Sequence, residues 1–232
     1  MFSLLSSVWL SDETVNGIGF LLKYAAQRRL RSTTNELVIT SSHFWTKLTQ
    51  AGKVYDADTW NSIHNWHGFS THTRGGKEHR FTKDLSKLQI GIPIHVPGHW
   101  LLAWIDFVNK RISIFDSMGY SRQSFLAILL AFVTDLYAKN GMKMPDGWVT
   151  RDMQKTIPQQ SNGYDCGVYT LWFMHCQLFN KGHLTDLPAT ESVTKLTIRE
   201  TLAKWLLEGK VMDNPTWVYA NSPSAGGEKR KR

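Results

Sequence analysis

Apolar residues recur at helical spacing along five stretches of the chain, each bounded by polar or turn-forming residues. Ser11 can cap a helix and the two acids after it favour a helix N-terminus, so we expect a helix from Ser11 to Arg29. A second strong pattern covers 121–140 and ends at Asn140-Gly141, which suits a helix C-terminus. We expect the other helices over 42–51, 167–179 and 193–208. The inward positions expected in the two strongest patterns are Val15, Ile18, Leu21, Leu22 and Ala25, and Phe125, Leu129, Phe132, Val133 and Leu136.

Between these helices, apolar runs with the spacing of strands predict a β-sheet. The run LQIGIPIHV (88–96) leads into HWLLAWIDF (99–107), and RISIFDS (111–117) alternates apolar and polar residues. A further short strand is expected near Trp148. Residues 55–85 are polar and rich in His, Gly and Thr without a clear period, and we expect them to be irregular.

Length and composition agree with a single domain. The 232 residues can bury one substantial core, and 42% hydrophobic with 20% charged residues is ordinary for a globular protein. We expect one α+β domain over 1–220 that acts as a monomer, followed by a flexible Ser/Gly/Lys/Arg tail over 221–232.

The net charge of +8 is concentrated at one end, because the terminal KRKR (229–232) supplies four of the charges. The remaining chain is only mildly basic, so we do not expect its body to bind nucleic acid. The KRKR itself suits a nuclear import signal or an anchor for polyanions, or it has no function.

Cysteine usage and the apolar runs favour a soluble protein of a reducing, intracellular compartment. Cys166 and Cys176 are too few for a disulfide framework or a Cys-rich zinc site. Residues 1–14 lack the basic leader and long apolar stretch of a signal peptide, and the apolar run 125–133 is too short to span a bilayer. No cofactor and no membrane partner are expected. A metal site is not expected either, because the four clustered histidines lack Cys partners and regular helical spacing: His64, His67, His72 and His79.

The most informative segment for chemistry is PQQSNGYDCGVYTLWFMHC (158–176), in which a polar turn runs into a cysteine that opens an apolar helix. A helix N-terminus stabilises a thiolate, so Cys166 is a candidate nucleophile. Gly163 and Gly167 would let the backbone turn tightly and let a substrate carbonyl approach. A buried structural cysteine is the alternative, and Cys176, ten residues on, fits that description better.

A nucleophilic cysteine needs a base and an orienting carboxylate, and His99 and Asp116 are placed for these roles. If the hairpin turns about Phe107-Val108, His99 and Asp116 lie directly opposite on neighbouring strands, with Cβ atoms ~5 Å apart. Asp106 is an odd seven residues from His99 and faces the other side of the sheet. A turn at Asn109-Lys110 would break this register, and turn chemistry alone does not exclude it.

The blocks GHWLLAWID, IFDSMG and PQQSNGYDCGVY resemble the signature of the Ulp1/sentrin-specific protease family, which also includes the adenovirus protease. WLSDETVN and ITSSHFWTKL resemble two further elements of that family, in the same order. The resemblance spans Trp9 to Cys176 and implies a papain-like α+β fold with a central mixed β-sheet packed between helices. The chain departs from the family pattern at two places. Only eight residues precede Trp9, where the family usually has additional sequence, and the 55–85 stretch is longer and richer in His than expected; both differences bear on substrate recognition.

The resemblance also implies roles for individual residues. Cys166 matches the nucleophile, His99 the general base, Asp116 its orienting carboxylate, and Gln160 the oxyanion-hole glutamine, with Gln159 as its neighbour. Trp9 and Trp100 match two tryptophans that close a tunnel over a Gly-Gly tail, and Asp12 matches an acid that contacts a basic patch on the bound modifier. The residues alone leave other roles open: core packing for either tryptophan, loop capping for Gln160 and helix initiation for Asp12.

The implied activity is hydrolysis of the peptide or isopeptide bond after the C-terminal Gly-Gly of a ubiquitin-like modifier. SUMO is the expected partner, with ubiquitin and NEDD8 as alternatives. A non-catalytic binder of such modifiers and an acyltransferase with a similar triad are the rival interpretations. Self-cleavage at Gly75-Gly76 or Gly226-Gly227 is a further, weaker hypothesis.

Overall fold

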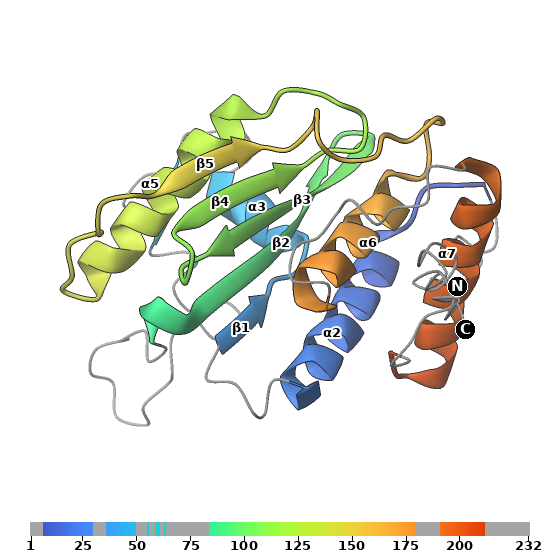
Figure 1. Ribbon diagram of the computed structural model, residues 1–232, viewed down its shortest axis with the longest axis horizontal. Helices are drawn as coiled ribbons and strands as arrows, with labels where there is room; N and C mark the ends of the chain where they lie inside the picture. The colour runs from blue at the N-terminus through green and yellow to red at the C-terminus, as the bar shows by residue number, and fades with distance from the viewer. Residues whose placement is uncertain are drawn as a thin grey trace, which may run out of the picture.

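The structure is a computed structural model that describes residues 7–29, 36–49, 55, 59–60, 63, 84–179 and 191–211. Its centre is a five-stranded mixed sheet in the order β1-β2-β3-β4-β5 (Figure 1). The outer pairs β1–β2 and β4–β5 are parallel, whereas β2–β3 and β3–β4 are antiparallel. The strands are β1 (Glu36–Ile39), β2 (Leu88–Val96), β3 (His99–Asp106), β4 (Arg111–Phe115) and β5 (Val149–Asp152).

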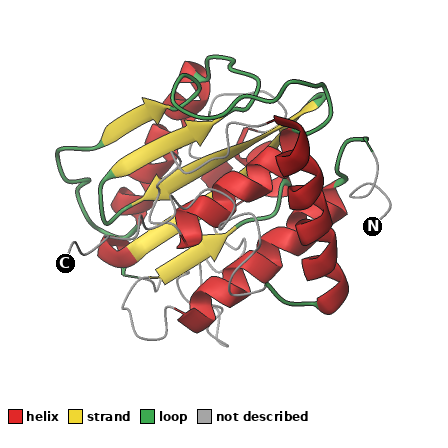
Figure 2. Ribbon diagram, turned by 45° about the vertical axis from the view of Figure 1, so that its right-hand side comes forward, coloured by secondary structure: helices red, strands yellow, loops and turns green. Residues whose placement is uncertain are grey.

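Helices cover both faces of the sheet (Figures 1 and 2). On one side α2 (Asp12–Arg29) and α6 (Cys166–Phe179) pack against the sheet, and α7 (Glu191–Glu208) packs on these two helices. On the other side lie α3 (His43–Thr49) and α5 (Gln123–Lys139), and a short 3₁₀ helix, η2 (Leu85–Lys87), leads into β2. The expected α+β arrangement, with a mixed sheet between helices, is confirmed.

The central strand β3 is buried on both faces, and all eight of its residues are buried. Its even-numbered residues Trp100, Leu102 and Trp104 pack in the core under α2 and α6. The odd-numbered residues Leu101, Ala103 and Ile105 pack in the core under α3 and α5. A strand covered on both sides needs apolar residues at nearly every position, which explains the continuous run in the sequence.

The expected helices are all present, with their ends shifted by a few residues. Ser11 caps α2 by accepting a hydrogen bond from the Thr14 N–H (3.4 Å). Asn140 is the C-cap of α5, and Gly141 follows it at φ +68°. The apolar stripes are nearly those predicted, but three expected inward residues, Leu21, Ala25 and Phe125, are only half-buried. The neighbouring positions that are buried instead are Ala26, Leu126 and Tyr137.

Two features of the chain were not anticipated from the sequence. Strand β1 is only four residues long, too short for a periodic pattern, and it forms by pairing in parallel with β2 from Glu36↔Leu88 onward. Within 55–85, expected to be irregular, Thr59, Trp60 and Ile63 are helical. Most of that stretch lies outside the described residues, as do the tail over 221–232 and both di-glycines. None of the described helices is long and apolar enough to cross a membrane.

The hairpin of β3 and β4 turns later than predicted. Leu102 pairs with Phe115 and Asp106 with Arg111, so residues 107–110 form the loop and His99 does not lie directly opposite Asp116. The Asp106 carboxylate stabilises this wider loop by accepting hydrogen bonds from the Asn109 backbone N–H (3.0 Å) and side-chain amide (2.7 Å). A shift of two residues leaves every side chain on its original face, whereas a shift of one would have separated the pair.

Candidate active site

The candidate nucleophile is a buried cysteine at the start of a helix. Cys166 is the first residue of α6, carries a free thiol and exposes 1% of its surface. The unpaired N–H groups and the dipole of a helix N-terminus favour a thiolate at this position. Cys176 also has a free thiol but lies in the body of α6, buried among apolar residues.

A histidine–carboxylate pair lies at the end of the β3–β4 hairpin. The imidazole Nε2 of His99 is 2.7 Å from Oδ1 of Asp116, and both side chains are buried. Asp116 has two more donors: the Met118 backbone N–H (2.8 Å to Oδ1) and the Arg122 guanidinium (Nε to Oδ2, 2.7 Å). Because its oxygens are held from three directions, the carboxylate fixes the orientation of the imidazole ring.

Burial and charge act in opposite directions on these groups. Burial lowers the pKa of His99, but hydrogen bonds to Asp116 and to the Cys166 thiol, with the negative charges of both, raise it to about 9. Burial raises the pKa of Asp116, yet the hydrogen bonds that it accepts and the charge of His99 hold that pKa below its usual value. At neutral pH the pair is therefore an imidazolium beside a carboxylate.

The second ring nitrogen of His99, Nδ1, does not contact Asp116 and is available to the Cys166 thiol. Nδ1 of His99 is buried and has no hydrogen-bond partner of standard geometry within the described part of the chain. Since the Cys166 thiol contributes to the raised pKa of His99, Nδ1 is the atom that can exchange a proton with the sulfur. The exposed Tyr120 ring packs edge-on to the imidazole, with the ring centroids 6.4 Å apart.

Gln160 lies in the loop before Cys166 and is held at both ends of its side chain. Its Oε1 accepts a hydrogen bond from the Ser117 hydroxyl (2.6 Å), and its Nε2 donates to the Asn162 carbonyl (2.6 Å). Its backbone N–H donates to the Ser117 carbonyl (2.8 Å). The neighbouring Gln159 instead turns back to donate to the carbonyls of Gln154 and Ile157.

The two candidate tunnel tryptophans differ in exposure. Trp9 is 52% exposed, and its indole N–H donates to the Gly163 carbonyl while its ring packs over Gly98, the residue before His99. Trp100 is 2% exposed, donates its N–H to the Leu10 carbonyl (3.1 Å) and stacks on His95, with the ring centroids 4.3 Å apart. Trp100 thus fills the core edge, whereas Trp9 lies between the loop before Cys166 and the turn before His99.

Asp12 already has partners inside the protein. Its Oδ2 accepts a hydrogen bond from the Ser42 hydroxyl (2.9 Å), and its Oδ1 is 3.1 Å from Nδ1 of His95. Asp12 is also the first residue of α2, where an acid suits the helix dipole. This position fits helix initiation, one of the roles that the sequence left open for Asp12.

Of the two glycines expected to matter near Cys166, Gly163 lies in the bend before α6 and Gly167 is the second residue of that helix. Neither Gly163 nor Gly167 has a positive φ angle. A Cβ at Gly167 would lie 3.0 Å from the Leu10 Cβ, so this glycine is needed for close packing of the N-terminal segment on α6. A Cβ at Gly163 would meet open space. Neither position therefore depends on the left-handed backbone conformation that glycine allows.

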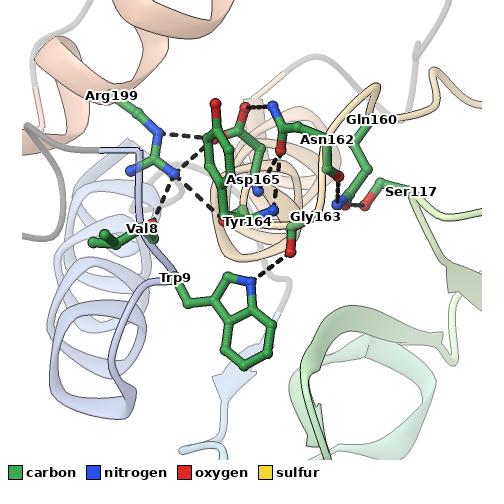
Figure 3. A network of polar contacts seen from close by, with 9 residues as sticks. All are labelled: Val8, Trp9, Ser117, Gln160, Asn162, Gly163, Tyr164, Asp165 and Arg199. Carbon is green, nitrogen blue, oxygen red and sulfur yellow. Dashed lines mark hydrogen bonds and ion pairs between the residues drawn. The ribbon is translucent and has the colours of Figure 1, made fainter.

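A network of polar contacts fixes the loop that precedes Cys166 (Figure 3). The Asn162 side chain accepts hydrogen bonds from the N–H groups of Tyr164 and Asp165 and donates to the Asp165 carboxylate (2.7 Å). Buried Arg199 of α7 pairs with Asp165 at 2.6 Å and donates to the Val8 carbonyl (3.1 Å). The loop is thereby tied both to α7 and to the segment that carries Trp9.

The sequence did not reveal the residues that support the candidate triad and the loop. Ser117 and Arg122 follow Asp116 closely in the chain, so proximity was the only available signal. Asn162 lies in a polar turn that already drew attention, but its bonding pattern depends on the loop conformation. Arg199 gave no signal, because it lies 34 residues from its partner Asp165. Among the described residues no group of His, Cys, Asp and Glu could hold a metal ion.

A mixed sheet between helices, with a thiol at a helix start and a carboxylate-bound imidazole beside it, is the arrangement of papain-like cysteine peptidases. Residues 9–199 match the model of the Ulp1 protease family, C-terminal catalytic domain. The chain belongs to the Ulp1 protease family. The resemblance drawn from the sequence is therefore confirmed.

The curated relatives are sentrin-specific and ubiquitin-like-specific proteases with much longer chains. The chain is 27% identical to human sentrin-specific protease 5 over 209 residues, 88% of this chain and 23% of that protein. It is 29% identical to human sentrin-specific protease 2 over 165 residues, 70% of this chain and 24% of that protein. With ubiquitin-like-specific protease 1A of Arabidopsis thaliana it shares 27% over 169 residues, 72% of this chain and 31% of that protein. The chain spans less than a third of the length of each.

Solved structures share the fold. The Chaetomium thermophilum Ulp1-like SUMO protease catalytic domain matches with a TM-score of 0.68 and 24% identity, covering 91% of this chain and 78% of that one. The Ulp1 protease domain in complex with Smt3, the yeast ortholog of SUMO, matches with a TM-score of 0.61 and 22% identity, covering 89% and 80%. At these identities the likeness concerns the fold.

Proposed function

We propose that this chain is a cysteine protease that hydrolyses the bond after the C-terminal Gly-Gly of a ubiquitin-like modifier. The observation that carries the proposal is the contact between His99 and Asp116 (2.7 Å), next to the Cys166 thiol at the start of α6. Because both Asp116 and Cys166 raise the pKa of His99 to about 9, the imidazole is protonated at neutral pH and its charge favours negative charge on the nearby sulfur.

In the first half of the reaction the Cys166 thiolate attacks the carbonyl carbon of the terminal glycine. Negative charge develops on the carbonyl oxygen, where the Cys166 backbone N–H and the free N–H of the Gln160 amide are the candidate donors. His99 then transfers its proton to the leaving amine as the C–N bond breaks. The product is a thioester between Cys166 and the modifier.

In the second half His99, now neutral, accepts a proton from a water molecule that attacks the thioester carbonyl. The C–S bond breaks, the modifier leaves with a terminal carboxylate, and the proton remaining on His99 pairs again with the thiolate. Asp116 keeps the imidazole oriented through both steps without itself taking the proton. The cycle uses no group beyond the protein and water.

SUMO is the modifier that we propose, as a precursor or as an isopeptide conjugate. The support is the names of similar proteins: the curated relatives include sentrin-specific proteases, and a structural neighbour is bound to a SUMO ortholog. Trp9 contacts Gly163 and packs over Gly98, and Trp100 follows His99 in β3; we propose that the two indoles border a narrow path that admits glycines and excludes larger side chains. Ubiquitin and NEDD8 would use the same chemistry.

The experiment that tests this proposal is a panel of SUMO, NEDD8 and ubiquitin probes with a C-terminal electrophile. We expect the SUMO probe to label wild type fastest, Cys166→Ala to remain unlabelled, and Cys176→Ala to label like wild type. Fluorogenic cleavage of the matching modifier, lost in Cys166→Ala, would distinguish a protease from a binder. Labelling of Cys176 alone, or acetyl transfer to a lysine substrate without hydrolysis, would refute the proposal.

A further inference from the structure

Two consecutive residues that directly follow β4 each contact a different part of the candidate catalytic apparatus. Asp116 binds the imidazole of His99, and Ser117 donates its hydroxyl proton to Oε1 of Gln160 (2.6 Å). Asp116 and Ser117 are both almost completely buried. His99 and Gln160, 61 positions apart in the sequence, are therefore both anchored by the two residues that follow β4.

The contacts of Gln160 determine which way its amide group points (Figure 3). The Asn162 carbonyl can only accept, so the end of the amide that faces it (2.6 Å) carries the nitrogen. The Ser117 hydroxyl then donates to the oxygen at the other end, and the backbone N–H of Gln160 donates to the Ser117 carbonyl. One of the two N–H bonds of Nε2 is used by Asn162, and the other is left for a ligand.

We propose that Ser117 is a positioning residue that holds the Gln160 amide with its free N–H available to the developing oxyanion. The inference deepens the proposed function, and it rests on that function. An oxyanion donor is effective only when it is already oriented, because reorientation during the reaction would cost part of its stabilising energy. Without the hydroxyl, the amide oxygen loses its partner and the side chain can rotate about its terminal bond.

The size of the effect follows from the population of the productive orientation. Complete loss of one oxyanion donor lowers kcat about 10²- to 10³-fold. Loss of Ser117 keeps the donor but leaves it correctly oriented for only a fraction of the time, and the rate falls by that fraction. We expect Ser117→Ala to lower kcat about 3- to 30-fold and to leave KM nearly unchanged.

A double-mutant cycle separates positioning from a merely structural role. In wild type, Ser117→Ala should lower kcat, whereas in a Gln160→Ala background it should have no further effect, because no amide remains to be oriented. The matched control is Ser113→Ala, a buried serine within β4, which should leave kcat unchanged in either background. If Ser117→Ala folds poorly, Ser117→Cys keeps the size of the side chain but is a weak donor.

Two reagents test the same variants at the level of chemistry. Alkylation of Cys166 by iodoacetamide develops no oxyanion, so Ser117→Ala should react at the wild-type rate. A modifier with a C-terminal aldehyde forms a tetrahedral adduct with an oxyanion, so its affinity should fall about as much as kcat. Equal effects of Ser117→Ala with and without Gln160, or slowed alkylation, would overturn the inference. Absence of activity in wild type would instead refute the proposed function itself.

Discussion

Replacing Asp116 by Asn removes the negative charge behind His99 while keeping the shape of the side chain. In wild type the difference between a His99 pKa of about 9 and the ordinary 6.5 corresponds to about 3 kcal/mol in favour of the charged ring. In Asp116→Asn two influences on the pKa of His99 would remain: burial, which lowers it, and the Cys166 thiol, which raises it. We therefore expect the pKa of His99 to fall toward or below 6.5 and activity at neutral pH to fall by up to about 10²-fold, the factor that corresponds to about 3 kcal/mol.

The measurement is a titration of the histidine ring signals by NMR between pH 5 and 10, with the His99 signal identified by its loss in His99→Asn. Wild type should show a midpoint near 9 for His99, and Asp116→Asn a midpoint at least two units lower. Alkylation of Cys166 in a Cys176→Ala background should slow in parallel at pH 7. A midpoint that stays above 8 in Asp116→Asn would refute the argument that the carboxylate is responsible for the raised pKa.

The same shift has a consequence for stability. Because the pKa of His99 is raised on folding, its contribution to the free energy of unfolding is fully present below pH 6.5 and is lost as pH rises through about 9. The difference in Tm between wild type and Asp116→Asn should therefore be largest near pH 6 and shrink toward pH 9.5. A difference that grows with pH over this range would contradict the assignment.

Three further predictions concern groups outside the reacting atoms. Gly167→Ala should lower the free energy of unfolding by about 1–2 kcal/mol, because its methyl group would press on Leu10, whereas Gly163→Ala should not change Tm. Arg199→Met should cost about 3 kcal/mol in urea unfolding, since the buried Asp165 carboxylate loses its ion-pair partner, with Lys204→Met on the exposed side of α7 as the neutral control. Burial, aided by the charge of Arg29, lowers the pKa of His175 to about 3, so stability should be lost as pH falls below 6.5. His175→Phe should reduce that loss, measured as the decrease in Tm between pH 6.5 and 4.5. A decrease equal to that of wild type would contradict the assignment to His175.

Much of the fold could be predicted because its signals are local. The apolar run of β3, the stripe of α5 and the polar turn before Cys166 each report their environment within a few residues. The β3–β4 hairpin shows the limit of such reasoning, because the loop at 107–110 is stabilised by Asp106 and shifts the register by two residues. The side chains of His99 and Asp116 still meet, because a shift of two residues keeps each side chain on the same face of the sheet.

Other features depend on contacts between distant segments and had no local signal. Strand β1 exists because β2 pairs with it, and four residues cannot display a period. The bond between Ser117 and Gln160 joins positions 43 residues apart, and it requires both the end of β4 and the loop before α6 to be placed. Arg199 likewise reaches Asp165 only after α7 has packed on α2 and α6. Supporting residues of this kind are visible only once the tertiary structure is known.

Each carboxylate oxygen of Asp12 already has one partner within the protein, and this affects how a docking protein could use it. A guanidinium arriving from outside must share these oxygens with His95 and Ser42 or displace one of them, so it gains less than it would from a carboxylate without partners. Exposed ion pairs contribute only about 0–1 kcal/mol even when newly formed, and an exchange contributes less. Discrimination among modifiers at this position would therefore arise mainly from rejecting an ill-fitting neighbour, with little attraction toward the right one.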